Sequence, residues 1–228
     1  MSSIIPFSPF PVWRGLMGIF LSTVVPLSAG AAGLPVLAEG EAALRTWVGQ
    51  QGRQVLSFVG YSGAGYEDPQ AMLATAGRVL DGLDPARTVV AAGATADGIG
   101  AVYALARQRG FVTLGIVSSQ ARDEGVALSA HVDRVFFIPD STWGGRLPGG
   151  GLAPTSAALV GVSDALVGIG GGEIARDELL AARDAGKVVR FFPADMQHQA
   201  ARDKAAARGL PLPRDFRGAA HPVLLPDR

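Results

Sequence analysis

The chain of 228 residues contains no cysteine. This absence excludes disulfide bonds, thiolate metal sites and a cysteine nucleophile, and it leaves the cellular compartment open. Histidine is also rare, with three residues scattered at His131, His198 and His221. Their spacing matches no histidine metal motif, so the sequence predicts no metal site and gives no sign of a bound cofactor.

The sequence has no excess of either charge. Twenty basic residues balance twenty acidic ones, whereas a protein that coats nucleic acid needs clustered positive charge, so we expect no nucleic-acid partner. No Gly-Lys-Ser/Thr triplet is present, and no serine lies in a G-x-S-x-G motif. These absences argue against a P-loop ATPase and a serine hydrolase.

Charge is nearly absent from the N-terminal segment, where Arg14 is the only charged residue before Glu39. The apolar run at 15–27 is too short to span a bilayer, so we expect no membrane span. Ala29 and Ala31 fit the small-x-small rule of a signal-peptide cleavage site. Residues 1–31 are therefore either a signal peptide of an exported or periplasmic protein, which we favour, or an apolar N-terminal segment of a cytoplasmic one.

From residue 38 onward, short apolar runs alternate with helical patterns. The predicted strands are continuous, mainly apolar runs without an apolar/polar alternation, which is typical of strands buried on both faces of a parallel sheet. Parallel strands need crossover helices, so we expect one α/β domain over 38–228, Rossmann-like, with three αβα layers and a mostly parallel sheet. The predicted strands are 55–59, 88–92, 111–117, 134–138, 165–169 and 188–192, and the predicted helices are 38–51, 68–80, 99–109, 155–162, 173–185 and 197–208.

Glycine is abundant, with 31 residues, and much of it follows predicted strands directly. Ligands of open parallel sheets bind beyond the carboxyl ends of the strands, where glycine lets the backbone approach a phosphate. Tight packing of a helix on a strand explains any one such cluster, but three clusters favour a shared ligand site. Their candidate ligand-binding residues are Gly60, Ser62, Gly63, Gly93, Thr95, Gly98, Gly100, Gly170, Gly171, Gly172 and Glu173.

Three further candidates lie outside the glycine clusters. Trp143 lies in the long glycine-rich loop at 141–156, and it either stacks on a base or plugs the loop. Thr142 belongs to the same loop. Ser118 ends a predicted strand and either donates to a phosphate or serves as a turn residue.

The stretch from Gly171 to Glu178, Gly-Gly-Glu-Ile-Ala-Arg-Asp-Glu, resembles the P-G-G-x-G-T-x-x-E signature of the SLOG superfamily. This superfamily includes the LONELY GUY phosphoribohydrolases, DprA and the N-terminal domains of TRPM channels. The resemblance covers about residues 53–200 and implies a Rossmann-like domain that binds nucleotides or their derivatives. It assigns phosphate cradling to Gly171 and Gly172, and catalysis to Glu178.

The motif departs from the superfamily pattern at three positions, where Gly170, Ile174 and Ala175 replace proline, glycine and threonine. Because the hydroxyl is missing at Ala175, the sequence favours binding or sensing of a nucleotide-derived or phosphorylated ligand over hydrolysis. Arg176 is the second catalytic candidate, either binding a phosphate bidentately or forming a surface salt bridge.

Two alternatives to ligand binding remain open. One is a phosphoribohydrolase that releases a base from a nucleoside monophosphate, with Glu178 as its carboxylate. The other is an oligomeric scaffold without a ligand, in which side chains fill the glycine clusters. In each case we expect a homo-oligomer.

Overall fold

The computed structural model describes residues 35–225. The predicted signal peptide or apolar segment, 1–31, lies outside the described residues. Within them the chain forms a sheet of seven strands, all parallel, in the order β1-β5-β4-β3-β2-β6-β7. The strands are β1 (Val36–Glu39), β2 (Gln54–Gly60), β3 (Thr88–Ala92), β4 (Val112–Ser118), β5 (Arg134–Ile138), β6 (Ala165–Ile169) and β7 (Val188–Phe192).

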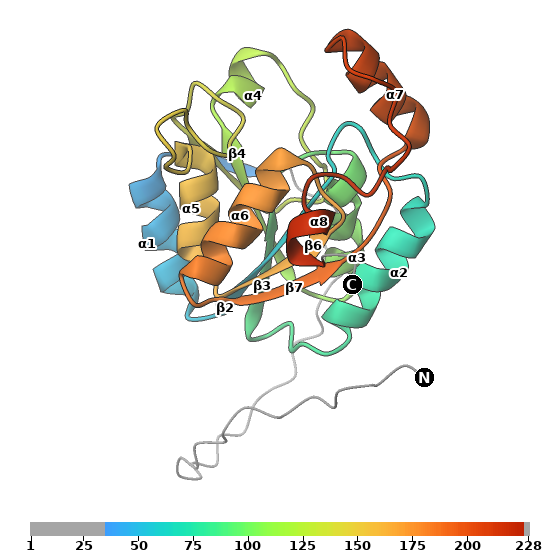
Figure 1. The fold of residues 1–228 in the computed structure, drawn as a ribbon. Coiled ribbons are helices and arrows are strands. Elements are labelled where there is room, and N and C mark those ends of the chain that lie inside the picture. The colour runs from blue at the N-terminus through green and yellow to red at the C-terminus, as the bar shows by residue number, and fades with distance from the viewer. Residues whose placement is uncertain (1–34, 226–228) are drawn as a thin grey trace, which may run out of the picture. The chain divides into compact units, whose positions relative to one another are not determined.

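Helices cover both faces of the sheet, so the fold has three layers (Figure 1). Helices α1, α5 and α6 pack on one face, and α2 and α3 pack on the other. The predicted Rossmann-like α/β fold is thereby confirmed. The helices are α1 (Glu41–Gln51), α2 (Pro69–Leu80), the 3-10 helix η1 (Gly98–Ala101), α3 (Val102–Gln108), α4 (Gln120–Asp123), α5 (Pro154–Val162), α6 (Glu173–Asp184), α7 (His198–Ala207) and α8 (His221–Leu224).

The interior strand β2 shows why the apolar runs are continuous. Val55 and Val59 pack into the cluster that contains Leu179 of α6. Leu56 and Phe58 point the other way, into the cluster that contains Met72 of α2. Because successive side chains alternate between faces and both faces are buried, the positions from Val55 to Gly60 must be apolar or small.

The strand order places a topological switch point beside β2. From β2 the chain adds β3, β4 and β5 in one direction, and then returns to place β6 on the other side of β2. Leu56 lies opposite Val90 of β3 and opposite Ala165 of β6. The crevice beyond the carboxyl ends of strands at such a point is where open α/β sheets bind ligands.

The N-terminal edge of the sheet corrects the sequence prediction. A helix was predicted from residue 38, whereas residues 36–39 form strand β1, which pairs with β5. Gly40, with φ of 82°, separates this strand from α1. Four half-exposed residues give too short a pattern to indicate an edge strand. Helices α4 and α8 were missed for the same reason, since each has four residues.

Candidate functional site

A cavity of about 520 Å³, here called the strand-end cavity, lies at the carboxyl ends of β2, β3 and β4 and at the start of α6. The sequence-predicted residues that line it are Gly60, Ser62, Gly63, Gly93, Thr95, Ser118, Trp143, Gly172, Glu173 and Glu178. They come from five separate stretches of the chain. Parallel strands end at one edge of the sheet, and the fold brings these stretches together there.

The other predicted residues lie outside the cavity lining, and the glycines among them are explained by packing. A Cβ on Gly100 would collide with the carbonyl oxygen of Thr95, and a Cβ on Gly170 would lie 2.6 Å from a ring carbon of Tyr61. Gly98 and Gly171 are similarly crowded. Gly60 lines the cavity, but its Cβ would lie 2.7 Å from the Ile169 carbonyl oxygen, so packing requires glycine there as well.

Three glycines of the lining are not crowded. A Cβ added to Gly63, Gly93 or Gly172 would meet no atom within 4 Å. None of the three has a positive φ, so their backbone conformations suit other residues. Gly172 is the N-cap of α6, a position that glycine suits. At Gly63 and Gly93, by contrast, neither packing nor conformation requires glycine, and its absent side chain leaves the backbone open to the cavity.

The first turn of α6 faces the same cavity through Gly172, Glu173 and Ile174. No side chain caps this helix. The first N–H groups of a helix have no partner within the helix, and the helix dipole adds a partial positive charge at this end. The α6 start is therefore suited to an anionic group.

Glu178 lies on α6 and is 6% exposed, with its side chain in the cavity wall. The pKa of its carboxyl is raised to about 7. Burial is the main cause, the hydrogen bond from Ser156 opposes it, and the charge of Asp177 adds to the increase. The Ser156 Oγ donates to Glu178 Oε1 at 2.7 Å and accepts from the Gly145 N–H at 2.8 Å. A carboxyl with a pKa near neutrality can donate or accept a proton at physiological pH.

Arg176 does not line the cavity that contains Glu178. Its Nε donates instead to the neighbouring Asp177 Oδ1 at 2.9 Å, and Arg146 Nε lies 3.9 Å from the same oxygen. Of the two interpretations of Arg176, phosphate binding and a salt bridge, the structure contains the salt bridge, which Arg176 forms with Asp177. Asp177 links α6 to the glycine-rich loop through Arg146.

Asp140 closes the glycine-rich loop at 141–156. It accepts from the Thr142 N–H and hydroxyl, each at 2.8 Å, and from the Thr155 N–H at 2.9 Å. Burial raises the pKa of Asp140, but these hydrogen bonds outweigh burial and hold it below its ordinary value. Thr142 thus forms hydrogen bonds within the loop and does not line the cavity. Trp143, which is 42% exposed, does line it.

The cationic residues of the lining were not predicted. Lys204 and Arg208, at the end of α7, are the only cationic side chains of residues 35–225 that line the cavity. Arg208 Nη1 lies 3.9 Å from Glu173 Oε2 at the start of α6. The sequence showed a basic outer face on the helix at 197–208, but it did not show that this helix lies near the strand ends.

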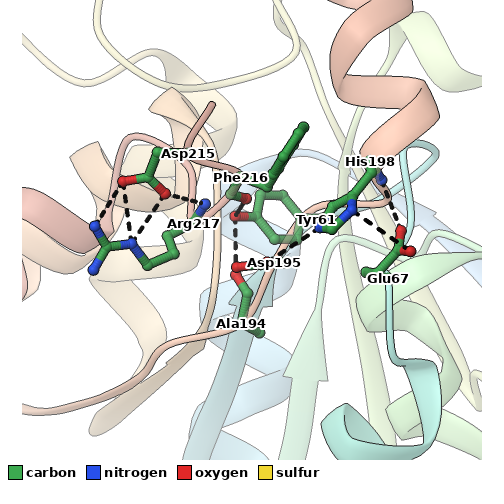
Figure 2. A network of polar contacts seen from close by, with 8 residues as sticks. All are labelled: Tyr61, Glu67, Ala194, Asp195, His198, Asp215, Phe216 and Arg217. Carbon is green, nitrogen blue, oxygen red and sulfur yellow. Dashed lines mark hydrogen bonds and ion pairs between the residues drawn. The ribbon is translucent and has the colours of Figure 1, made fainter. Parts of the chain in front are cut away.

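Phe216 connects α7 to the end of β2. Its ring stacks on His198 at a centroid distance of 3.9 Å, and the Arg202 guanidinium lies 5.3 Å from its centre. Figure 2 shows the Tyr61 hydroxyl directed at the carbonyls of Phe216 and Ala194, at 3.3 and 3.2 Å. Burial raises the pKa of Tyr61 to about 12, so this hydroxyl remains a donor.

Polar contacts around His198 fix the start of α7. Its backbone N–H donates to Glu67 Oε2 at 2.8 Å, and its ring Nε2 lies 3.2 Å from Asp195 Oδ2 (Figure 2). Because α7 contains no buried residue, these contacts and Phe216 position Lys204 and Arg208.

Two features are absent from the part of the chain that the structure describes, residues 35–225. No group of three or more His, Asp or Glu side chains in this part of the chain is arranged to hold a metal ion. Among the helices at 35–225, none combines the length and the apolar character that crossing a membrane requires.

Comparison with known proteins found no matching family model and no matching curated protein. Solved structures similar to the chain include the structural-genomics target TM1055, at 24% identity over 60% of this chain and 72% of that one. The molybdenum cofactor carrier protein of Chlamydomonas reinhardtii is 18% identical, and the match covers 75% of this chain and 96% of that one. DprA of Streptococcus pneumoniae is 13% identical, and the match covers 76% of this chain and 62% of that one.

The TM-score of each of these three pairs is 0.44. These similarities concern the fold alone. The fold assignment rests on the strand order of the sheet and does not depend on these comparisons.

Proposed function

We propose that the chain binds a small nucleotide-derived or phosphorylated ligand in the strand-end cavity. The observation that carries this proposal is the pair of open glycines, Gly63 and Gly93. Each follows a different strand, each borders the same cavity, and neither is needed for packing or for backbone conformation. Glycine at such a position lets a ligand approach the peptide N–H groups directly.

The charges around the cavity support an anionic ligand group. The α6 start offers uncapped N–H groups, and Lys204 and Arg208 lie across from it on α7. Helix N-termini and lysine or arginine side chains are the common partners of phosphate in proteins. Trp143 at the same cavity supplies an aromatic face for a base.

Isothermal titration with AMP, ADP, ribose 5-phosphate and inorganic phosphate tests the proposal. We expect at least one organic phosphate to bind, and Lys204→Ala to weaken it by about tenfold, the equivalent of 1.4 kcal/mol. Lys187→Ala is the matched control, because Lys187 donates to the Val160 carbonyl and does not line the cavity. No binding across the panel would contradict the proposal.

A second function, hydrolysis of an N-glycosidic bond, is favoured by one observation, the buried Glu178 with a pKa of about 7. Cleavage of this bond builds positive charge on the sugar, and a carboxylate beside it stabilises that charge or takes a proton from the attacking water. We expect such an activity to release free base from a nucleoside monophosphate and to be lost in Glu178→Gln. Unchanged release in this variant would exclude the role of Glu178.

The scaffold interpretation predicts that atoms fill every glycine cluster. Packing at Gly98, Gly100, Gly170 and Gly171 fits that interpretation, but the open Gly93 does not. Homo-oligomer formation, export and the alternative cytoplasmic location remain predictions from the sequence.

A further inference from the structure

The Glu178 carboxyl lies in the wall of the strand-end cavity with one of its two oxygens unpaired. Oε1 accepts the 2.7 Å hydrogen bond from Ser156, and this is the only hydrogen bond that the carboxyl forms within residues 35–225. The residue is 6% exposed and lines the cavity, so little bulk water reaches it. Oε2 therefore lacks a protein donor, and the cavity is the place from which a donor can come.

The surroundings of this carboxyl are apolar. Val59 and Leu159 line the same cavity and belong to the core cluster that contains Leu179, the residue after Glu178. Leu159 follows Ser156 by three residues in α5, so both lie on the face of α5 that meets the carboxyl. Opposite charges attract each other far more strongly in such surroundings than in water.

No cation within residues 35–225 forms an ion pair with Glu178. Arg176 forms its ion pair with the residue that follows it. The cationic side chains that line the cavity in this part of the chain are Lys204 and Arg208, both on α7, and Arg208 lies 3.9 Å from Glu173. Buried charges in proteins are normally paired, so a partner for the Glu178 carboxylate has to be brought by the ligand.

We infer that the ligand is an organic phosphate that also carries a protonated aliphatic amine, and that this amine binds the free oxygen of Glu178. The inference rests on the proposed function, which places the phosphate at the α6 start, and it adds the ligand class. Aminoalkyl phosphates and phosphates of amino sugars belong to this class.

The two binding positions lie on one helix at a distance that small molecules span. Gly172 precedes Glu178 by six residues, which is about 9 Å of helix at 1.5 Å per residue. Side chains of a helix lean toward its N-terminus, so the Glu178 carboxyl lies nearer to the α6 start than its Cα does. A chain of four carbon atoms or one sugar ring joins an amine and a phosphate over this span.

Burial distinguishes Glu178 from Asp97 and Glu173, the other carboxyls that line the cavity in the described part of the chain. Asp97 is exposed, and the Glu173 side chain is 63% exposed. Water screens an ion pair at either of them, so such a pair contributes little to binding. The desolvation of the Glu178 carboxylate is already included in the folding free energy, so the ammonium group loses only its own hydration on binding.

Probes that differ only in the cation test the inference. 4-Aminobutyl phosphate carries an ammonium group where 4-hydroxybutyl phosphate carries a neutral hydroxyl. At pH 8 an aliphatic amine is charged, as lysine is, and the Glu178 carboxyl, with its pKa of about 7, is mostly ionised. We expect the full chain to bind the amine at least tenfold more tightly than the hydroxyl compound in isothermal titration. Glucosamine 6-phosphate and glucose 6-phosphate form a second pair, which is expected to differ in the same direction.

Glu178→Gln isolates the contribution of the carboxyl. Glutamine keeps the size of the side chain and removes its charge, so the tenfold advantage of the amine is expected to disappear. Glu124→Gln, the matched control, makes the same change at an exposed carboxyl that does not line the cavity, and it is expected to keep the advantage.

The outcomes separate the two proposals. Equal affinity within both probe pairs overturns the inference and leaves the proposed function standing. An unchanged tenfold advantage in Glu178→Gln also overturns it, because another group then holds the amine. If neither pair binds while AMP, ADP or ribose 5-phosphate does, the inference alone is overturned. If no phosphate compound binds at all, the proposed function falls, and the inference with it.

Discussion

The Ser156 hydroxyl donates a hydrogen bond of 2.7 Å to the buried carboxyl of Glu178, on the wall of the strand-end cavity. The same oxygen accepts from the Gly145 N–H, so Ser156 joins the glycine-rich loop to the candidate catalytic carboxyl. It is the hydrogen bond that opposes the effect of burial on the Glu178 pKa.

Replacement of Ser156 by alanine is expected to raise the pKa of Glu178 above its wild-type value of about 7, because the ionised carboxylate loses its donor. A ¹³C NMR titration of glutamate side-chain carboxyls measures this pKa, with Glu178→Gln used to assign the signal. Ser163→Ala is the control, since it removes another buried hydroxyl, one that bonds to Ser57. A Glu178 pKa unchanged in Ser156→Ala would contradict the role assigned to this hydrogen bond.

The free energy of unfolding should depend on pH through Glu178. Its pKa is about 7 in the folded chain and about 4.5 without burial, so the folded state favours the protonated form. The contribution of Glu178 to the free energy of unfolding is fully present below pH 4.5. It is lost as pH rises from 4.5 through about 7. The loss is on the order of 3 kcal/mol, at 1.36 kcal/mol for each pH unit between the two pKa values.

Urea denaturation at pH 5 and pH 8 measures this dependence. We expect Glu178→Gln to reduce the difference between the two pH values, because the amide does not titrate. Glu173→Gln, a change at an exposed carboxyl of the same helix, is expected to preserve the difference. The same pH dependence in the wild type and Glu178→Gln would exclude Glu178 as its source.

Gly100 illustrates a glycine that serves packing. Its missing Cβ leaves room for the carbonyl of Thr95, so Gly100→Ala is expected to lower the free energy of unfolding by about 2 kcal/mol. Gly49→Ala is the control, because Gly49 lies in α1 with no atom within 4 Å of its Cβ position. Alanine favours the helix there and should raise stability by about 0.5 kcal/mol. Stability of Gly100→Ala equal to that of wild type would contradict this packing.

Phe216 is expected to determine the position of α7. Its ring lies against His198 and Arg202, so Phe216→Ala should increase amide hydrogen exchange over residues 198–207 and weaken phosphate binding that depends on Lys204. Hydrogen exchange followed by mass spectrometry measures the first effect, and isothermal titration the second. Leu212→Ala, a change at an exposed residue of the same segment, should alter neither. Wild-type exchange in Phe216→Ala would show that other contacts position the helix.

Much of the fold could be predicted from the sequence because the central strands are buried on both faces. A run such as 88–92 must then be apolar or small at every position, and the same five residues form β3. β1 could not be predicted, because a four-residue edge strand with exposed side chains has no such constraint. Its pairing with β5 depends on residues almost a hundred positions away.

The edge of the sheet at which the candidate site lies could also be predicted, since parallel strands end together. The sequence could not distinguish open glycines from packed ones. Gly60 and Gly170 are crowded by Ile169 and Ala194, which come from other strand ends, whereas Gly93 has open space. Lys204 could not be placed either, because α7 contacts Phe216, which follows it in the chain, and the sequence does not show this contact.

The proposed function depends most on Gly93 and Gly63, whose missing side chains leave the backbone open to a ligand. Isothermal titration of Gly93→Ala and Gly63→Ala with the tightest-binding organic phosphate, beside urea denaturation of the same variants, tests it most directly. We expect at least tenfold weaker binding and no loss in the free energy of unfolding, with Gly49→Ala binding as the wild type does. Wild-type affinity in both Gly93→Ala and Gly63→Ala, or weaker binding only in step with lost stability, would contradict it.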